Sequence, residues 1–281
     1  MSGGVVITGA SSGIGRACAL DLDRRGFRVF ATVRKDEDAA TLKRDASANL
    51  TPVIADVTDA EQIAQLHATV DDALGDESLR GVVNNAGIGV GGPLEFLEID
   101  ELRRQFEINT FAPVAVAQPF IARLRESHGR VVNITSIGGR VPQPFLGPYS
   151  SSKFALESLT TVMRRELLPW GIHVAAVAPG SMKTRIWEKG ASMVEQLQAN
   201  ASPEERRLYG KNMERMARVV KLADRTGAKP EKVAKAVAHA LTSERPRARY
   251  LVGADARMQL ALETALPTRL VDRLMSRVAG S

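Results

Sequence analysis

The chain of 281 residues has little of what disulfide-stabilised, metal-binding or membrane-spanning proteins need. Its one cysteine, Cys18, cannot form a disulfide within the chain, so we expect a reducing compartment and favour the cytoplasm. Its four histidines lie far apart in sequence, so no metal site is expected. No apolar run approaches the roughly 18 residues of a membrane span, and "MSGGVVITGA" lacks the features of a signal peptide. We therefore expect no integral membrane span.

Charge is unevenly distributed along the chain. Residues 1–179 carry a net charge of −3, whereas residues 180–281 carry +9. A basic C-terminal third could face nucleic acid or anionic lipid, or it could be the solvated faces of charged helices. No DNA-reading motif or run of stacking aromatic residues accompanies the basic residues, so we favour solvated faces and expect no nucleic-acid partner.

Short apolar strands alternate with helical stretches along most of the chain. This alternation is typical of a parallel sheet that is covered on both faces, and right-handed crossovers make such a sheet doubly wound. The predicted fold class is α/β, with one Rossmann-type domain of about seven strands over residues 1–281. The expected strands are 4–8, 27–33, 51–55, 79–85, 129–135, 172–178 and 248–253; the expected helices include 13–25, 59–74, 98–125 and one that begins near Tyr149.

Two segments depart from this rhythm. Residues 183–228 are helical in composition and rich in Met, Arg and Lys, and we expect them to form a substrate flap over one end of the sheet. Residues 254–281 are amphipathic and are expected to form a C-terminal helical extension. No internal repeat or linker divides the chain, so both segments are assigned to the same domain.

A glycine motif follows the first expected strand and opens the first helix, in "TGASSGIGRA". Gly9, Gly13 and Gly15 let the backbone turn tightly and approach a pyrophosphate, which would bind the free N–H groups at the helix N-terminus. Ser11 and Ser12 could cap the helix, or they could contact the adenosine ribose or its phosphate. The motif in this strand–turn–helix context indicates a dinucleotide site.

The end of the second strand bears on which dinucleotide binds. An NAD site places an acid there for the ribose 2′-hydroxyl, whereas an arginine accommodates the 2′-phosphate of NADP. Residues 32–34 contain no acid and end in Arg34, so we favour NADP(H), with NAD(H) and a plain surface role for Arg34 as the alternatives. Asp56, just after the third strand, is placed either to meet the adenine or to cap the next helix.

Tyr149 and Lys153 lie four residues apart in "GPYSSSKFALESL", at the start of an expected helix. This spacing places both side chains on one helical face. A chance pair on a surface is one interpretation. The other is chemical, because a lysine ammonium one turn from a phenol favours the phenolate and lowers the pKa of the tyrosine.

Six motifs together resemble the short-chain dehydrogenase/reductase family. They are "TGASSGIG" (8–15), "NNAG" (84–87), Asn109, Ser136, "YSSSK" (149–153) and "PGSMKT" (179–184), and their order and spacing match along almost the whole chain. The segments "HGRVVNITSIGGR", "LESLTTVMRREL" and "ARYLVGADARMQL" are closer to the steroid, retinol and 3-hydroxybutyrate dehydrogenase branch than to bacterial β-ketoacyl reductases.

The resemblance implies an oxidoreductase that moves a hydride between NAD(P)(H) and a secondary alcohol or ketone. It implies that Tyr149 is the general acid/base, that Lys153 binds the nicotinamide ribose, that Ser136 holds the substrate oxygen, and that Asn109 holds a water in a proton relay. It also implies a homodimer or homotetramer that pairs the helices near 98–125 and 149–168. The implied cofactor contacts are Gly9, Ser11, Ser12, Gly13, Ile14, Gly15, Arg34, Asp56, Val57, Asn85, Ala86, Gly87, Tyr149, Lys153, Pro179, Gly180, Met182 and Thr184.

The residues around the expected cleft bear on the substrate. They are mostly apolar, which favours a lipophilic small molecule such as a steroid, a retinoid or an acyl compound. Arg140, Lys183 or Arg185 turned inward would instead favour a charged hydroxy or keto acid or an acyl-CoA. A non-catalytic dinucleotide sensor is a further alternative, against which the intact proton-transfer residues argue. The expected substrate contacts are Ser136, Val141, Phe145, Leu146, Ile186 and Trp187.

Overall fold

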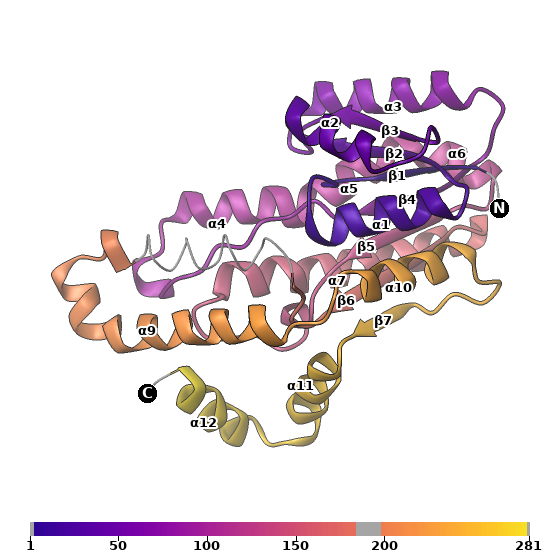
Figure 1. Ribbon diagram of the computed structural model, residues 1–281. Coiled ribbons are helices and arrows are strands. Elements are labelled where there is room, and N and C mark those ends of the chain that lie inside the picture. Colours follow the sequence, from indigo (N-terminus) through magenta and orange to yellow (C-terminus); the bar gives the residue numbers. More distant parts are fainter. Residues whose placement is uncertain (1–2, 184–197, 280–281) are drawn as a thin grey trace.

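A seven-stranded parallel sheet forms the centre of the protein in the computed structural model, which describes residues 3–183 and 198–279 (Figure 1). The strand order is β3-β2-β1-β4-β5-β6-β7, and every neighbouring pair is parallel. The order reverses between β1 and β4, the position at which doubly wound sheets bind ligands. The strands are β1 Gly4–Ile7, β2 Arg28–Val33, β3 Leu50–Ile54, β4 Leu79–Asn84, β5 Arg130–Ile134, β6 His173–Pro179 and β7 Arg249–Val252.

Helices cover both faces of this sheet. Val5 and Ile7 of β1 belong to the apolar cluster that includes Cys18 of α1 (Gly13–Arg24), Leu42 of α2 (Asp36–Arg44) and residues of α10 (Glu231–Thr242). Val6, between them, packs on the other face with residues of α3 (Ala60–Leu74), α5 (Ala112–Ala117) and α6 (Ile121–Glu126). Strands with both faces buried read as continuous apolar runs, and this explains why β1 shows no alternation in sequence.

The observed architecture confirms the predicted α/β doubly wound fold. Each expected strand is present, and each of its ends lies within one residue of the expected position. Helices α2 and α10 occupy stretches for which no helix was assigned from the sequence.

The helix expected over 98–125 is not continuous. It consists of α4 (Ile99–Phe106), a π-helical segment η2 (Glu107–Phe111), α5, a 3₁₀ turn (Gln118–Phe120) and α6. Prolines at the first turns of α5 and of the 3₁₀ segment lack the N–H that a continuous helix would use. The π segment contains Asn109, and such bulges are frequent at functional sites.

The C-terminal third contains α9 (Pro203–Thr226), α11 (Ala254–Ala265) and α12 (Thr268–Ala279), which extend away from the sheet (Figure 1). Arg215 of α9 donates a hydrogen bond to the carbonyl of Arg277 in α12, at 3.3 Å, so these two helices lie together. Within the described ranges, no helix is both long enough and apolar enough to cross a bilayer. The division into a flap over 183–228 and an extension over 254–281 stays a prediction.

Candidate active site

The glycine loop after β1 brings the backbone of two strand ends into close contact. Gly9 has a φ of +69°, and a Cβ added there would lie 2.8 Å from the Cα of Ala86. A Cβ on Gly15 would overlap the carbonyl oxygen of Gly9 and the side-chain amide of Asn85. Gly13 has a φ of +58°, which side chains other than glycine rarely adopt. The loop therefore tolerates only glycine at the three predicted positions.

Residues of the "NNAG" segment hold this loop in place. The hydroxyl of Thr8 accepts hydrogen bonds from the backbone N–H groups of Asn85 and Ala86, both at 3.0 Å. The side-chain amide of Asn85 donates to the carbonyls of Thr8 at 2.9 Å and Gly9 at 3.0 Å. Asn85 and Ala86 thus lie at the predicted cofactor site, and they set the shape of the glycine loop.

The N-terminus of α1 has the features of an anion site. Ser12 is the N-cap residue, but its side chain makes no capping hydrogen bond to the described part of the chain. The hydroxyls of Ser11 and Ser12 are partly exposed, and Ile14 follows at the start of the helix. A tight glycine turn and a helix N-terminus with an uncommitted hydroxyl fit a dinucleotide pyrophosphate.

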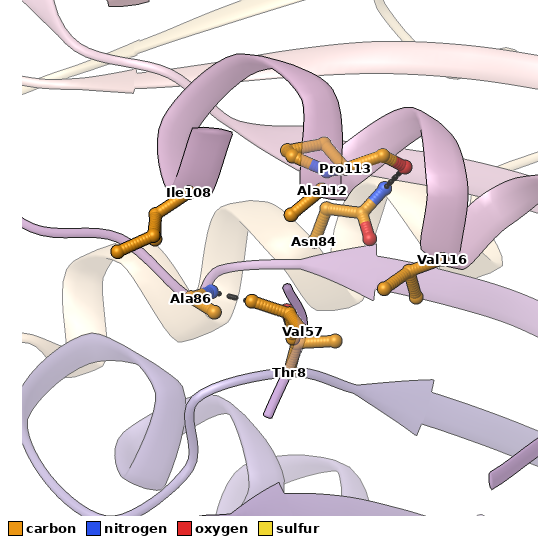
Figure 2. Close-up of a pocket in the computed structure, with 8 residues that line it drawn as sticks. All are labelled: Thr8, Val57, Asn84, Ala86, Ile108, Ala112, Pro113 and Val116. Carbon is orange, nitrogen blue, oxygen red and sulfur yellow. Dashed lines mark hydrogen bonds between the residues drawn. The ribbon is translucent and has the colours of Figure 1, made fainter. Parts of the chain in front are cut away.

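Close-up views show a hollow beside the glycine loop, lined by Thr8, Val57, Asn84, Ala86, Ile108, Ala112, Pro113 and Val116 (Figure 2). The space inside it is too small even for a water molecule, so it is a gap in the packing and not a ligand pocket. Asn84 donates from its amide nitrogen to the carbonyl of Pro113 at 2.9 Å. The hollow shares Val57 and Ala86 with the predicted cofactor contacts, but it is too small to hold a dinucleotide.

Arg34 and Asp56 lie at the ends of β2 and β3, next to the glycine loop. The two side chains are 4.0 Å apart at their closest charged atoms, and the Arg34 side chain is 64% exposed. The backbone N–H of Thr58 and, more weakly, Arg34 lower the pKa of Asp56. Asp56 Oδ1 accepts from both the N–H and the hydroxyl of Thr58, and Oδ2 is the oxygen near Arg34. Because most of its side chain is exposed, Arg34 is accessible to a phosphate.

Ser136, Tyr149 and Lys153 come together at the carboxyl end of β5. Tyr149 and Lys153 lie one turn apart on α7 (Gly147–Leu167), and Ser136 follows β5. Ser136 Oγ and the ring of Tyr149 lie close together, because a Cβ on Gly138 would be 3.5 Å from the first and 3.3 Å from the second. Ser136 Oγ accepts from the N–H of Gly138 at 3.0 Å, which leaves its hydroxyl proton available. A Cβ on Gly138 would lie 3.3 Å from the ring of Tyr149, so this glycine packs against the pair.

Burial controls the ionisation of both residues on α7. Burial raises the pKa of Tyr149, and the hydrogen bond from Ser136 opposes this rise. Burial also lowers the pKa of Lys153 to about 8, against the attraction of Glu157. The sequence predicts that Lys153 and the positive charge of an oxidised nicotinamide together lower the pKa of Tyr149; in the protein alone, burial dominates and raises it.

Asn109 lies in the π segment and reaches the loop after "NNAG". Its side-chain oxygen accepts from the N–H of Ile88, and its nitrogen donates to the carbonyl of Ile88, both at 2.9 Å. The nitrogen also donates to the hydroxyl of Ser152 on α7 at 3.2 Å. A Cβ on Gly87 would approach Asn109 to 3.1 Å. Asn109 therefore joins the loop to α7, and a water relay through it stays a prediction.

The segment after β6 is held by the C-terminal extension. Pro179 ends β6, and Gly180 N donates to the carbonyl of Val252 at 2.9 Å. Ser181 N donates to Asp255 of α11 at 2.7 Å, and a Cβ on Gly180 would overlap that carboxylate. Met182 is 3% exposed within the core. Of the predicted cofactor contacts in this segment, Thr184 lies outside the described residues.

The predicted substrate contacts divide into three groups. Phe145 and Leu146 are half-buried just before α7, near Tyr149. Val141 is fully buried beside Ile137 and Ala256 of α11, so it packs the C-terminal extension instead of lining an open pocket. Ile186 and Trp187 lie outside the described residues.

An aromatic cluster that the sequence analysis missed lies beside Phe145. Tyr209 of α9 makes edge contacts with Phe96 and Phe145, with ring centroids 5.9 and 6.0 Å apart. Its hydroxyl donates to Glu95 at 2.7 Å. Phe145 has a φ of +64°, and its carbonyl accepts from Gly92 at 2.7 Å. These residues come from three distant segments, so no local sequence pattern links them.

A buried acid that the sequence analysis also missed is Glu157, one turn beyond Lys153. The signal in the sequence was the position of Glu157 four residues after Lys153, the same spacing that separates Tyr149 from Lys153.

In the described parts of the chain, no group of three or more His, Cys, Asp or Glu side chains is placed to hold a metal ion.

Comparison with known proteins agrees with this geometry. The model of the short chain dehydrogenase family matches residues 4–195. The chain is 34% identical to an NADPH-dependent 3-dehydrocapnine reductase from Ornithobacterium rhinotracheale, with 96% of this chain and 94% of that protein covered. It is 35% identical to retinol dehydrogenase 5 of Mus musculus, with 97% and 87% covered.

A solved structure is also similar along the whole chain. The short chain dehydrogenase from Burkholderia cenocepacia in complex with NADP is 25% identical, has a TM-score of 0.73, and covers 97% of both chains. The family model matches more than half of this chain, and the two relatives are more than 30% identical to it over nearly its whole length. This chain therefore belongs to the short chain dehydrogenase family of oxidoreductases.

Proposed function

We propose that the protein is an NADP(H)-dependent oxidoreductase that interconverts a secondary alcohol and a ketone. The observation that carries this proposal is that Ser136 and Tyr149 lie together against Gly138, with Lys153 one turn away on α7. A dinucleotide sensor would need the glycine loop but would have no use for a phenol placed next to a serine.

The bound coenzyme would supply or accept the hydride, and the protein would handle the proton. Ser136 would hold the carbonyl oxygen with its available hydroxyl proton. Tyr149 would donate its phenolic proton to that oxygen during reduction and take it back during oxidation. Lys153 would bind the nicotinamide ribose and place positive charge near the phenol as the proton leaves.

The ionisation of Tyr149 favours the direction of carbonyl reduction. Its pKa is raised by burial, so the phenol is protonated at neutral pH and is ready to donate. Oxidation of an alcohol needs the phenolate, which forms only as the pH rises towards the pKa of Tyr149. We therefore expect reduction to be the faster direction at neutral pH and oxidation to gain rate in alkali.

The preference for NADP(H) is supported by Arg34 and by the relatives. Arg34 stands at the end of β2, exposed and 4.0 Å from Asp56, where it can meet a 2′-phosphate. The 3-dehydrocapnine reductase is described as NADPH-dependent, and the Burkholderia cenocepacia enzyme was solved with NADP. The family's predicted cofactor contacts fit the shape of the site, because the glycine loop and the N-terminus of α1 are open to a pyrophosphate.

A lipophilic substrate is supported by the aromatic cluster. Phe96, Phe145 and Tyr209 are half-buried and in contact, and Phe145 comes four residues before Tyr149. Aromatic walls select apolar ligands. The similarity to a retinol dehydrogenase points to the same class. Arg140 is partly exposed near this region, and a charged keto acid or acyl-CoA is the competing substrate class.

A homodimer or homotetramer in the cytoplasm completes the proposal. Apolar side chains are exposed on α7 and on the π segment, namely Phe154 at 41%, Val162 at 43% and Phe111 at 53%. Exposed apolar surface of this kind is typical of a contact between subunits. Light scattering on the purified chain would determine the oligomeric state.

The experiment that tests the proposed function is NADPH oxidation with a panel of carbonyl compounds. The panel contains retinal, steroid ketones, diketones, quinones and small charged keto acids, each assayed with NADPH and with NADH. We expect turnover with NADPH and a kcat/KM that rises with the apolar size of the ketone. Absence of turnover across the panel with bound NADPH would favour the sensor, and a preference for keto acids would reject the lipophilic pocket.

A further inference from the structure

The end of β5 contacts three successive turns of α7 through three consecutive residues. The carbonyl of Ile134 accepts a hydrogen bond from Lys153 Nζ at 2.9 Å. The hydroxyl of Thr135 donates to Glu157 Oε1 at 2.7 Å. Ser136 Oγ lies beside the ring of Tyr149, since a Cβ on Gly138 would be 3.5 Å from the hydroxyl oxygen and 3.3 Å from the ring. Tyr149, Lys153 and Glu157 are spaced by four residues each and therefore lie along one face of the helix.

Glu157 is a charged group inside the protein, with 4% of its surface exposed. Its second carboxylate oxygen accepts from Arg249 Nε at 2.9 Å and from Arg249 Nη2 at 2.6 Å. Arg249 is the first residue of β7 and its side chain is 33% exposed. Both oxygens of Glu157 thus have partners, which is the condition under which a carboxylate can stay buried and ionised.

Lys153 needs an anionic neighbour because it is buried. Desolvation lowers its pKa to about 8, and Glu157 opposes that fall. The other elements that pack here provide little charge: β5 offers the carbonyl of Ile134, and the 3₁₀ segment Ile137–Gly139 has no titratable side chain. Tyr149 lies one turn before Lys153, and Arg249 is bonded to Glu157.

We propose that Glu157, held by Thr135 and Arg249, is a positioning residue that keeps Lys153 charged and fixed beside Tyr149. The proposal rests on the proposed function, since it assigns Lys153 to the coenzyme and the phenol. Glu157 acts through Lys153 and does not itself touch the coenzyme or substrate. Arg249, the first residue of β7, pairs with Glu157, so the last strand of the sheet contributes to the site.

A purely structural role for Glu157 predicts something different. A buried ion pair that only ties α7 to β7 would change the stability of the fold when broken, without changing the pH dependence of the site. A positioning role predicts that loss of the carboxylate charge changes the pH at which Lys153 loses its proton. The two roles are therefore separated by pH profiles.

The test is Glu157→Gln in the full-length chain, since Gln keeps the shape and can still accept from Thr135. Two quantities are measured from pH 5.5 to 9.5: NADPH affinity by fluorescence titration, and kcat/KM for a carbonyl compound that the wild-type enzyme reduces. We expect NADPH affinity and kcat/KM to fall as the pH rises and Lys153 loses its proton. In the variant, this fall should occur about one pH unit lower than in the wild type. At pH 9, above both titrations, the variant should be about tenfold weaker in both quantities.

Thr160→Val is the matched control on the same helix. Thr160 is buried, accepts from Asn133 Nδ2 at 2.8 Å, and carries no charge. We expect this variant to melt at a lower temperature and to keep the wild-type pH profiles. The double variant Glu157→Gln/Arg249→Met is the second test if the single variant fails to fold, because it also removes Arg249, the cation that the single variant leaves without its carboxylate partner.

Unchanged pH profiles in a folded Glu157→Gln or double variant would overturn the proposal and leave the ion pair as a tether between α7 and β7. If the wild-type chain binds NADPH but reduces no carbonyl compound, the proposed function fails. The pH dependence of NADPH binding would then still decide the role of Glu157.

Discussion

The two halves of the site are built in different ways. On the coenzyme side, the loop after β1 is fixed by glycines without room for a Cβ and by hydrogen bonds that Asn85 donates to the hydroxyl and the carbonyl of Thr8. On the substrate side, side chains from distant segments meet: Tyr209 of α9 contacts Phe96 and Phe145. Backbone constraints leave little freedom, whereas side-chain contacts can be exchanged. The coenzyme half should therefore be intolerant of substitution, and the substrate half should be adaptable.

The strongest test of this contrast is Gly15→Val. Its side chain would overlap the carbonyl of Gly9 and the amide of Asn85, so the loop must move. Overpacking costs about 1–3 kcal/mol or more, so we expect roughly 100-fold weaker NADPH binding. Gly210→Ala in α9 is the control, because a Cβ there meets nothing within 4 Å. NADPH titration of both variants measures the effect, and equal affinities would contradict the constraint on the loop.

Lys153 lies where the two halves meet, and its buried charge should be visible in the stability of the fold. Its pKa is about 8 in the folded chain and 10.5 when unperturbed. Because the unfolded state binds more protons between these values, Lys153 adds stability as the pH rises from 8 to 10.5. The gain is at most about 3 kcal/mol.

Urea unfolding of the wild type and Lys153→Met across this pH range measures that gain. We expect the free energy of unfolding of the wild type to rise relative to the variant. Lys35→Met is the control, because Lys35 is exposed. The free energy of unfolding of this variant should differ from that of the wild type by the same amount at every pH. If the difference in free energy of unfolding between the wild type and Lys153→Met does not change with pH, Lys153 is not desolvated.

Arg34→Ala tests the one part of the coenzyme half that depends on a mobile side chain. A charge-assisted contact with a phosphate should be lost, so NADPH affinity should fall by about ten- to a hundredfold. NADH lacks the 2′-phosphate, so its affinity should be unchanged and serves as the internal control. Tighter binding of NADH than of NADPH to the wild type would show that the interpretation of the end of β2 is wrong.

Substitution of Tyr209 should give the smallest effect, on the substrate half. Tyr209→Ala removes both aromatic edge contacts, and we expect KM for an apolar ketone to rise about two- to tenfold. Tyr209→Phe keeps the ring and loses only the bond to Glu95, so it should remain close to the wild type. NADPH affinity should not change in either variant. A larger loss in Tyr209→Phe would mean that the hydroxyl matters more than the ring.

The coenzyme half was largely predictable from the sequence because its determinants are local. Gly9, Gly13 and Gly15 lie within seven residues, and Tyr149 and Lys153 are one turn apart. The regular alternation of strands and helices predicted the sheet. The π segment around Asn109 was not predicted, because the hydrogen bond between Asn109 and Ile88 is a tertiary contact that composition does not indicate.

The substrate half was less predictable for a physical reason. The buried location of Val141 depends on α11, more than 100 residues away in sequence, and the pairing of Glu157 depends on Arg249 in β7. Burial of Tyr149 raises its pKa in the protein alone, and spacing along a helix indicates a neighbouring charge but does not indicate desolvation. Long-range contacts of this kind leave no signal in a local pattern.

The most direct test of the central claim is the rate of a single turnover by Tyr149→Phe with NADPH and an accepted ketone. Phe keeps the ring that packs against Gly138 and removes only the proton donor. We predict a loss of about 10²–10⁴ in rate, with NADPH affinity and melting temperature close to those of the wild type. Turnover near the wild-type rate would contradict the assignment of Tyr149 as the proton donor.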